Sequence, residues 1–170
     1  MGDEIHFAVR SPSTSRPGWE QLTEYSAGGL VWQDADSVVF LKSKTGAEKS
    51  FYIPKGHVDI VDSFAEDIIT AGIRETREEM NFPASASLRF NGFVTNYREQ
   101  KDFEKSKEQS FKTITIVGLS LDDVLQTNRW IHEEKHIVGM KWDDVYRYVH
   151  PDFEPHLREY HCHLSMRGKL

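Results

Sequence analysis

The sequence predicts a single domain, an α+β or α/β sandwich of a β-sheet and helices. The chain has 170 residues, which is a typical length for one domain. Hydrophobic residues make up 38% of it and aromatic residues 12%, enough to form a substantial core. Segments with strand periodicity come first, one helical segment follows, and further strands precede a helical C-terminal part. This order is typical of a sheet covered by helices.

The chain is predicted to begin with an extension. Residues 1–9 either add a short strand or stay mobile, and residues 10–18 (RSPSTSRPG) are rich in Ser and Pro and therefore predict a loop. Regular periodicity starts soon afterwards. We therefore expect an N-terminal extension at 1–22, a folded domain at 23–165 and a tail at 166–170.

Three short strands are predicted at the start of the domain. Residues 28–32 and 37–42 (SVVFLK) indicate the two strands of a hairpin, with QDAD as its turn. Residues 50–53 indicate another strand, which Pro54 and Gly56 end.

A helix is predicted over about residues 64–80. Ser63 followed by Glu66 has the spacing of a capping box, so the helix should start near Phe64. Its apolar side is a stripe at spacings of four, three and four residues, which is predicted to be buried. The stripe consists of Ile69, Ile73, Thr76 and Met80.

The remaining elements are predicted from alternation and helical spacing. We expect strands at 88–97, 111–119 and 139–142, a charged loop at 98–110, and helical pieces at 143–149 and 152–163.

Glu75, Glu78 and Glu79 are predicted to form an acidic face on the helix. At about 100° per residue they lie within one arc beside the apolar stripe. Arg74, four residues before Glu78, can brace it, and Arg77 is predicted to point to solvent. Three neighbouring carboxylates repel one another, and a hard cation such as Mg²⁺ relieves this repulsion. Such an ion also binds phosphates and lowers the pKa of bound water, whose proton a carboxylate can accept.

The whole segment 53–82 resembles the Nudix box, G-x5-E-x7-R-E-U-x-E-E-x-G-U with U apolar. Gly56 corresponds to the first glycine, residues 74–79 (RETREE) to the central motif, and Phe82 to the last apolar position. The resemblance covers about residues 24–160. It implies the Nudix fold, which is an α-β-α sandwich of the α+β class with a mixed β-sheet, a catalytic helix at about 64–80 and a C-terminal helix. It also implies a metal-dependent pyrophosphohydrolase.

The sequence departs from this pattern at three places. Asn81 replaces the late glycine and Thr76 an apolar residue. Asp62 stands five residues after Gly56 but four residues too early for Arg74, whereas Glu66 has the correct spacing to Arg74 and requires a four-residue insertion. We expect an insertion that adds one helical turn, and both Asp62 and Glu66 remain candidates for the first carboxylate of the box.

The resemblance implies a role for each matching residue. Catalysis falls to Arg74 and the acidic face, with Glu75 nearest the attacking water. The metal, Mg²⁺ or Mn²⁺, would be held by the carbonyl of Gly56 and by the acidic face. A further carboxylate often comes from a later loop of the family's members, and Glu133 or Glu134 is the candidate, with Glu134 preferred.

The substrate implied is a small phosphorylated molecule. The string at 54–59, with Lys55 and His57, resembles that of asymmetric dinucleoside-tetraphosphate hydrolases, and Tyr97 is a candidate for stacking on a base. The loop at 98–112, which includes Arg98 and Lys112, can reach a polyphosphate. A dinucleoside polyphosphate is therefore our first expectation. Alternatives are a diphosphoinositol polyphosphate, capped RNA, or a Nudix-fold sensor that binds nucleotide without turnover.

Charge and composition limit the partners and the cellular compartment that we expect. The net charge of −6 argues against a broad nucleic-acid surface, although capped RNA stays open. Cys162 is the single cysteine, and the sequence contains neither a membrane span nor a secretory signal. We expect the protein in the cytosol or nucleus.

Overall fold

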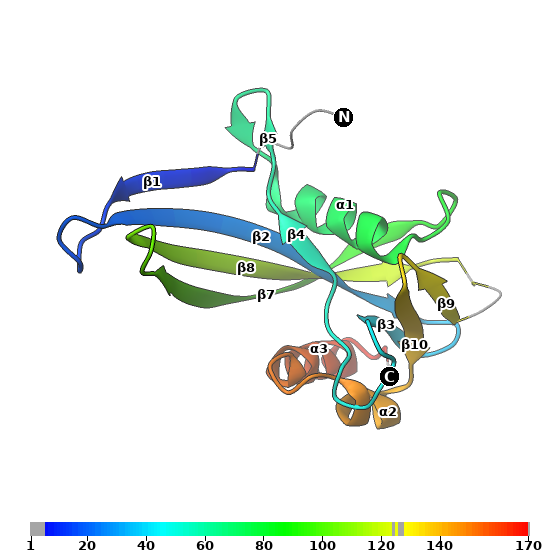
Figure 1. The fold of residues 1–170 in the computed structure, drawn as a ribbon. Coiled ribbons are helices and arrows are strands. Elements are labelled where there is room, and N and C mark those ends of the chain that lie inside the picture. Colours follow the sequence, from blue (N-terminus) through cyan, green and yellow to red (C-terminus); the bar gives the residue numbers. More distant parts are fainter. Residues whose placement is uncertain (1–5, 124, 126–127, 170) are drawn as a thin grey trace.

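A mixed β-sheet with helices on both faces forms the centre of the computed structural model, which describes residues 6–123, 125 and 128–169 (Figure 1). Residues 1–5, part of the predicted extension, and residue 170 of the predicted tail lie outside this range. Among the described residues, eight strands join in one sheet, in the order β7-β8-β2-β3-β10-β9, with β1 and β4 also paired to β2. These are β1 (Ala8–Pro12), β2 (Glu20–Gln33), β3 (Val38–Ser43), β4 (Lys55–His57), β7 (Leu88–Phe103), β8 (Glu108–Leu121), β9 (Arg129–His132) and β10 (Lys135–Met140).

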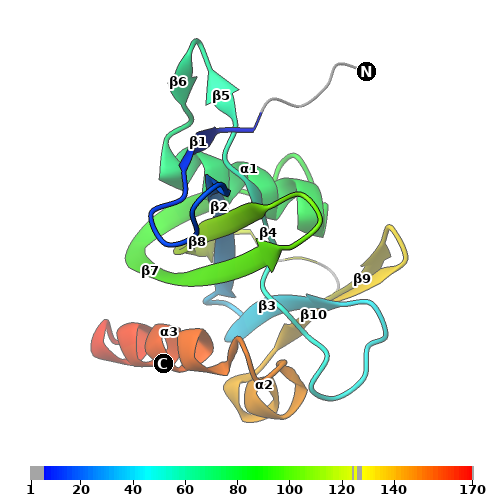
Figure 2. The ribbon, with the colours of Figure 1, turned by 60° about the vertical axis from the view of Figure 1, so that its left-hand side comes forward.

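The α-β-α sandwich predicted from the sequence is confirmed. Helix α1 (Ile68–Met80) covers one face of the sheet, and α2 (Trp142–Tyr148) and α3 (Glu154–Met166) cover the other (Figures 1 and 2). A separate hydrophobic cluster lies under each layer. One includes Val31, Phe40, Met80 and Phe82 on the α1 side, and the other includes Leu30, Trp32, Tyr160 and Leu164 on the α2–α3 side.

The β2–β3 hairpin confirms the first predicted strand pair, and β2 also forms the only parallel pairing, with β8, among the described strands. The predicted strand at 50–53 reduces to single bridges of Phe51 and Tyr52. The segment 54–56, predicted to end that strand, instead leads into β4. Part of the predicted loop at 10–18 belongs to β1, which pairs with β2.

The prediction of a charged loop at 98–110 is wrong. Both β7 and β8 continue through it and pair as far as Phe103 and Glu108. The cross-strand ladder holds this part, although neither of its faces shows the apolar alternation that predicts a strand. Arg16 ties it further to Asp102 and Glu104, at 3.0 and 3.1 Å. In Figure 1, β2, β7 and β8 extend beyond the helices.

The predicted helix start near Phe64 is also wrong. Asp62 and Ser63 both have positive φ values, 50° and 69°, and form the two-residue turn of a small hairpin of β5 (Ile60–Val61) and β6 (Phe64–Ala65). Asp67 instead caps α1, since its side chain accepts a hydrogen bond from the Thr70 amide at 3.1 Å. The four extra residues therefore build a hairpin and not a further helical turn.

The end of α1 agrees with expectation. Asn81 adopts the left-handed conformation (φ 50°, ψ 46°) that ends the helix. Phe82 is buried and meets Phe40 edge to face at 5.5 Å. The end of the helix is thereby anchored to the core.

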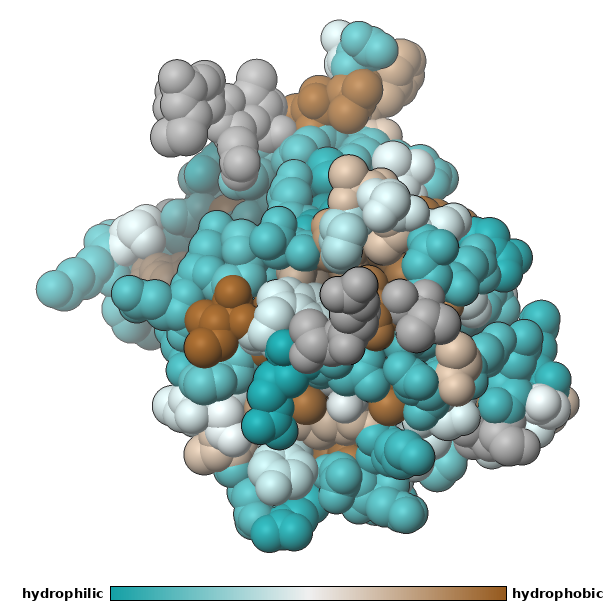
Figure 3. Space-filling view, turned by 90° about the vertical axis from the view of Figure 1, so that its right-hand side faces the viewer, coloured by the Kyte–Doolittle hydropathy of each residue, from teal (hydrophilic) through white to brown (hydrophobic). Residues whose placement is uncertain are grey.

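In the described part of the chain, no helix has the length and apolar content needed to cross a bilayer. The side that carries the end of α1 and β9 is mainly hydrophilic, with apolar residues in small separate patches (Figure 3).

Candidate active site

Arg74 organises the site from the first half of α1. Its guanidinium donates to both carboxylate oxygens of Glu66, from Nε at 2.9 Å and from Nη2 at 2.8 Å. Nη2 also reaches the carbonyl of His57 at 3.0 Å, and Nη1 reaches Glu75 at 2.8 Å and Glu78 at 3.2 Å. A single planar cation therefore connects the start of the helix, strand β4 and two carboxylates of the acidic face.

Glu66 takes the place of the first carboxylate, which the sequence left open between Asp62 and Glu66. Its side chain is 6% exposed and also accepts the amide of Asp59 at 3.3 Å. The hydrogen bonds from Arg74 lower the pKa of Glu66 and raise that of Arg74. Asp62 lies at the exposed tip of the β5–β6 hairpin, whereas Asp59 meets Arg74 at 3.3 Å.

Glu75 is held between Arg74 and the backbone of β4. A Cβ atom at Gly56 would lie 2.0 Å from the Glu75 carboxylate, so a side chain at residue 56 would displace that carboxylate. Burial raises the pKa of Glu75, and the hydrogen bond from Arg74 opposes this shift. Gly56 and Glu75 thus form one closely packed unit.

The buried side of α1 fits tightly against the sheet. A Cβ atom at Gly72 would lie 2.7 Å from Val117, which explains a glycine in the middle of the helix. The Thr76 hydroxyl, at a position where an apolar residue is usual, donates to the Gly72 carbonyl at 2.7 Å. Ile69 and Ile73 of the predicted stripe are partly buried against the core, while Met80 is fully buried.

Arg77 does not point to solvent as predicted. It is partly buried and donates to the carbonyl of Ala86 at 2.6 Å. Its role is to fix the chain after the helix.

Glu79 meets two lysines from the neighbouring strands. Lys42 of β3, 1% exposed, contacts its carboxylate directly, and Lys135 of β10 approaches the same oxygen to 3.7 Å. Burial, and next the charge of Lys135, lower the pKa of Lys42. The ion pair with Lys42 had no signal in the sequence, because Lys42 stands in a strand pattern that predicts only a hydrophobic core.

The donor set of the acidic face fits a hard divalent cation. It offers carboxylate oxygens, with Glu78 57% and Glu79 30% exposed, beside the glycine backbone of β4. Among the described residues, no three His, Cys, Asp or Glu side chains already converge on one point. The carboxylates are instead paired with cations of the protein, Glu75 and Glu78 with Arg74 and Glu79 with the lysines.

Glu133 and Glu134 form the turn between β9 and β10, both with positive φ and both exposed. Lys135 follows this turn directly and lies 3.7 Å from the Glu79 carboxylate, which places the turn near Glu79. The assignment of Glu134 as a further metal ligand stays a prediction.

Lys55, His57 and Tyr97 project from the face of the sheet opposite α1. Ladder partners point to the same side, and His57 pairs with Ser26, Ser26 with Ile114, and Ile114 with Tyr97. Lys55 is half-buried, and burial lowers its pKa. Because Gly56 lies between Lys55 and His57, β4 turns its glycine to Glu75 and these two side chains to the opposite face. Burial lowers the pKa of His57, which favours its neutral ring.

Tyr97 is half-buried and stacks on His156 of α3, with ring centroids 4.5 Å apart. Its hydroxyl is one of the buried polar atoms without a partner in the described structure. Arg98 and Lys112, from the segment predicted as a loop, line a cavity of about 610 Å³ over β2, β7 and β8.

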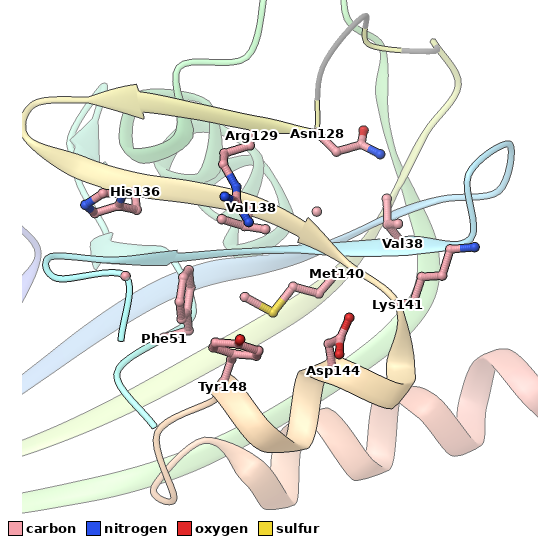
Figure 4. A pocket seen from close by; sticks show the side chains of 12 residues that line it. Val38, Phe51, Asn128, Arg129, His136, Val138, Met140, Lys141, Asp144 and Tyr148 are labelled. Carbon is pink, nitrogen blue, oxygen red and sulfur yellow. The ribbon is translucent and has the colours of Figure 1, made fainter. Parts of the chain in front are cut away.

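A second cavity of about 460 Å³ lies between β3, β10 and α2 (Figure 4). Phe51, Met140 and Tyr148 form its apolar part, and His136 and Arg129 stand at its rim. The acidic face of α1 does not line it.

Comparisons with known proteins agree with this geometry. A sequence profile of the NUDIX domain matches residues 22–164. A solved structure of an Ap4A hydrolase from C. elegans in a binary complex is 19% identical and covers 84% of this chain and 98% of its own, with a TM-score of 0.59. A Nudix hydrolase from M. smegmatis is 20% identical over 83% of this chain and 88% of its own, with a TM-score of 0.52. A search of curated proteins found no match.

Proposed function

The chain belongs to the Nudix hydrolase family and is a pyrophosphohydrolase, and on this premise we propose that it hydrolyses dinucleoside polyphosphates with Mg²⁺. Members of the family generally use divalent metal ions and act on small phosphorylated molecules. The observation that carries the proposal is the unit formed by Glu66, Arg74, Glu75 and Gly56, which fixes one carboxylate of the acidic face beside β4.

The acidic face is the proposed metal site. Glu75, Glu78 and Glu79, with the backbone carbonyl of Gly56, would hold Mg²⁺, or Mn²⁺ in its place, and Glu134 is a candidate from the β9–β10 turn. The bound ion would neutralise phosphate charge and acidify a water molecule.

The protein's own residues position and deprotonate the water. Arg74 holds Glu75 at 2.8 Å, so this carboxylate has a fixed direction. We assign to Glu75 the acceptance of the proton as the water oxygen bonds to phosphorus. The bond from that phosphorus to the bridging oxygen breaks, and the leaving phosphate takes the electron pair.

The opposite face of β4 supports the choice of substrate class. Lys55 offers a cationic side chain and His57 a hydrogen-bonding ring for phosphates that pass around the edge strand β4 from the acidic face. Tyr97 is the fourth residue in the row that begins at His57, and three strand spacings separate the two by roughly 14 Å. Ser26 and Ile114, which lie between them, are 3% and 0% exposed, so the row itself is not an open surface. The contacts of Lys55 and His57 with phosphates and of Tyr97 with a base are therefore parts of the proposal that the substrate panel must test.

The test is a substrate panel with Mg²⁺ and product masses. It contains diadenosine polyphosphates, nucleoside diphosphate sugars, diphosphoinositol phosphates and capped RNA. We expect cleavage of a diadenosine polyphosphate with the highest kcat/KM. Preferential cleavage of the inositol compound or of capped RNA would refute the substrate class, and nucleotide binding without any cleavage would indicate a sensor.

A further inference from the structure

Lys42 is an unusual residue because a lysine is rarely fully buried. It lies in the middle of the sheet on β3, and its side chain is 1% exposed. A buried ammonium needs a partner, and its partner is the carboxylate of Glu79. The ring of Tyr52 also lies 5.4 Å from the ammonium.

Lys135 adds a second positive charge at the same carboxylate. Its ammonium is 3.7 Å from the oxygen that Lys42 contacts, and its side chain is 25% exposed. The two lysines come from adjacent strands, β3 and β10, which are paired in the sheet. Glu79 is therefore neutralised from the sheet side, whereas Arg74 neutralises Glu75 and Glu78.

A carboxylate oxygen that pairs closely with an ammonium is not free to coordinate a metal ion. Both lysines meet Oε2 of Glu79, so the pairing lowers the fraction of molecules in which this oxygen is ready to bind. The apparent affinity for a metal that uses this oxygen falls by the same fraction. The positive charge of the lysines also repels a divalent cation directly.

We propose that Lys42, assisted by Lys135, is an internal cation that a divalent metal must displace from Glu79, so that this lysine pair sets the metal concentration at which the site fills. The inference rests on the proposed function, since it takes Glu79 as a metal ligand. Lys42 is here a positioning residue, which acts on the metal through Glu79.

The first experiment measures binding of Mn²⁺ directly, from the free-ion electron paramagnetic resonance signal, without substrate. Lys42→Met removes the charge and keeps an unbranched side chain, and replacing a buried charge by an apolar residue of similar volume is often tolerated. We expect the dissociation constant to fall about tenfold, because Glu79 is no longer occupied. Lys135→Met should give a smaller fall.

Lys44→Met is the matched control. It removes the same charge from an exposed position two residues further on and should leave the dissociation constant unchanged. An unchanged or raised constant in a folded Lys42→Met protein would overturn the inference, because a lysine that merely supports Glu79 would weaken metal binding when removed.

A second measurement uses the unmutated protein, in case Lys42→Met does not fold. In ¹³C-labelled protein, addition of Mg²⁺ should shift the Cε resonance of Lys42 with the same midpoint as metal binding, while that of Lys44 should not move. A stationary Lys42 resonance during saturation would contradict displacement.

The outcomes separate this inference from the proposed function. Protein that binds no metal and shows no hydrolysis would overturn both. Protein that binds metal and hydrolyses the substrate, but whose affinity is insensitive to Lys42, would overturn the internal cation alone.

Discussion

Replacement of Glu66 by Gln tests the assignment of the first carboxylate in energetic terms. The change keeps the shape of the side chain but removes the charge that accepts two hydrogen bonds from Arg74, at 2.8 and 2.9 Å. Charge-assisted hydrogen bonds contribute about 1.5–3 kcal/mol each, against about 0.5–1.5 kcal/mol for neutral ones. In Gln only the amide oxygen accepts, so one bond is weakened and the other is lost. At a 6% exposed carboxylate this should lower the free energy of unfolding by at least roughly 2 kcal/mol.

The assay is urea unfolding at pH 7, together with kcat/KM on the best substrate. A loss of this size should lower Tm by about 4–8 °C in a chain of this length. Catalysis should also decline, because Arg74 directs Glu75. Asp62→Asn is the control on the hairpin tip and should change neither quantity. If Asp62→Asn reduced stability or activity as much as Glu66→Gln, the reasoning would be wrong.

Three further results are expected. Gly56→Ala should reduce kcat, measured at saturating substrate, about a hundredfold. The reason is that the new methyl group would lie 2.0 Å from the Glu75 carboxylate and displace it, and an unchanged kcat would contradict this tight packing. Tyr97→Leu should raise KM for a dinucleoside polyphosphate about tenfold, because stacking on the base is lost, while Tyr97→Phe should leave KM unchanged. Equal effects of the two variants on KM would exclude stacking. Folding lowers the pKa of Glu66, so the stabilisation that its carboxylate provides is complete above the unfolded pKa of 4.5 and disappears as pH falls through the lower folded value. The difference in free energy of unfolding between the unmutated protein and Glu66→Gln should therefore close in urea titrations from pH 6 to pH 3. A constant difference would refute this.

The sequence predicted the acidic face of α1 better than the residue at which this helix begins. The acidic face and the Asn81 helix end follow from helical geometry and local backbone preference, which act within a few residues. Ser63 has a plausible capping spacing, yet Asp67 caps the helix and Ser63 belongs to a turn. Val-Asp-Ser-Phe, two polar residues between apolar ones, was the available signal for that hairpin.

The long β7–β8 pair and the lysines at Glu79 depend on tertiary contacts. Residues 98–110 are charged on both faces, and only the ladder with the neighbouring strand makes them extended. Lys42 lies among apolar residues of β3, and nothing local indicates that its partner is 37 residues away. The choice between Asp62 and Glu66 likewise needed the position of Arg74, eight residues after Glu66.

Turnover of a diadenosine polyphosphate by Glu75→Gln in ¹⁸O-labelled water tests the central claim most directly. The unmutated protein should incorporate ¹⁸O into one phosphate product with Mg²⁺ and should lose this activity in EDTA. Glu75→Gln should fold with an unchanged circular dichroism spectrum and lose at least about a hundredfold in kcat. Full ¹⁸O incorporation by folded Glu75→Gln, or full activity in EDTA, would contradict the account.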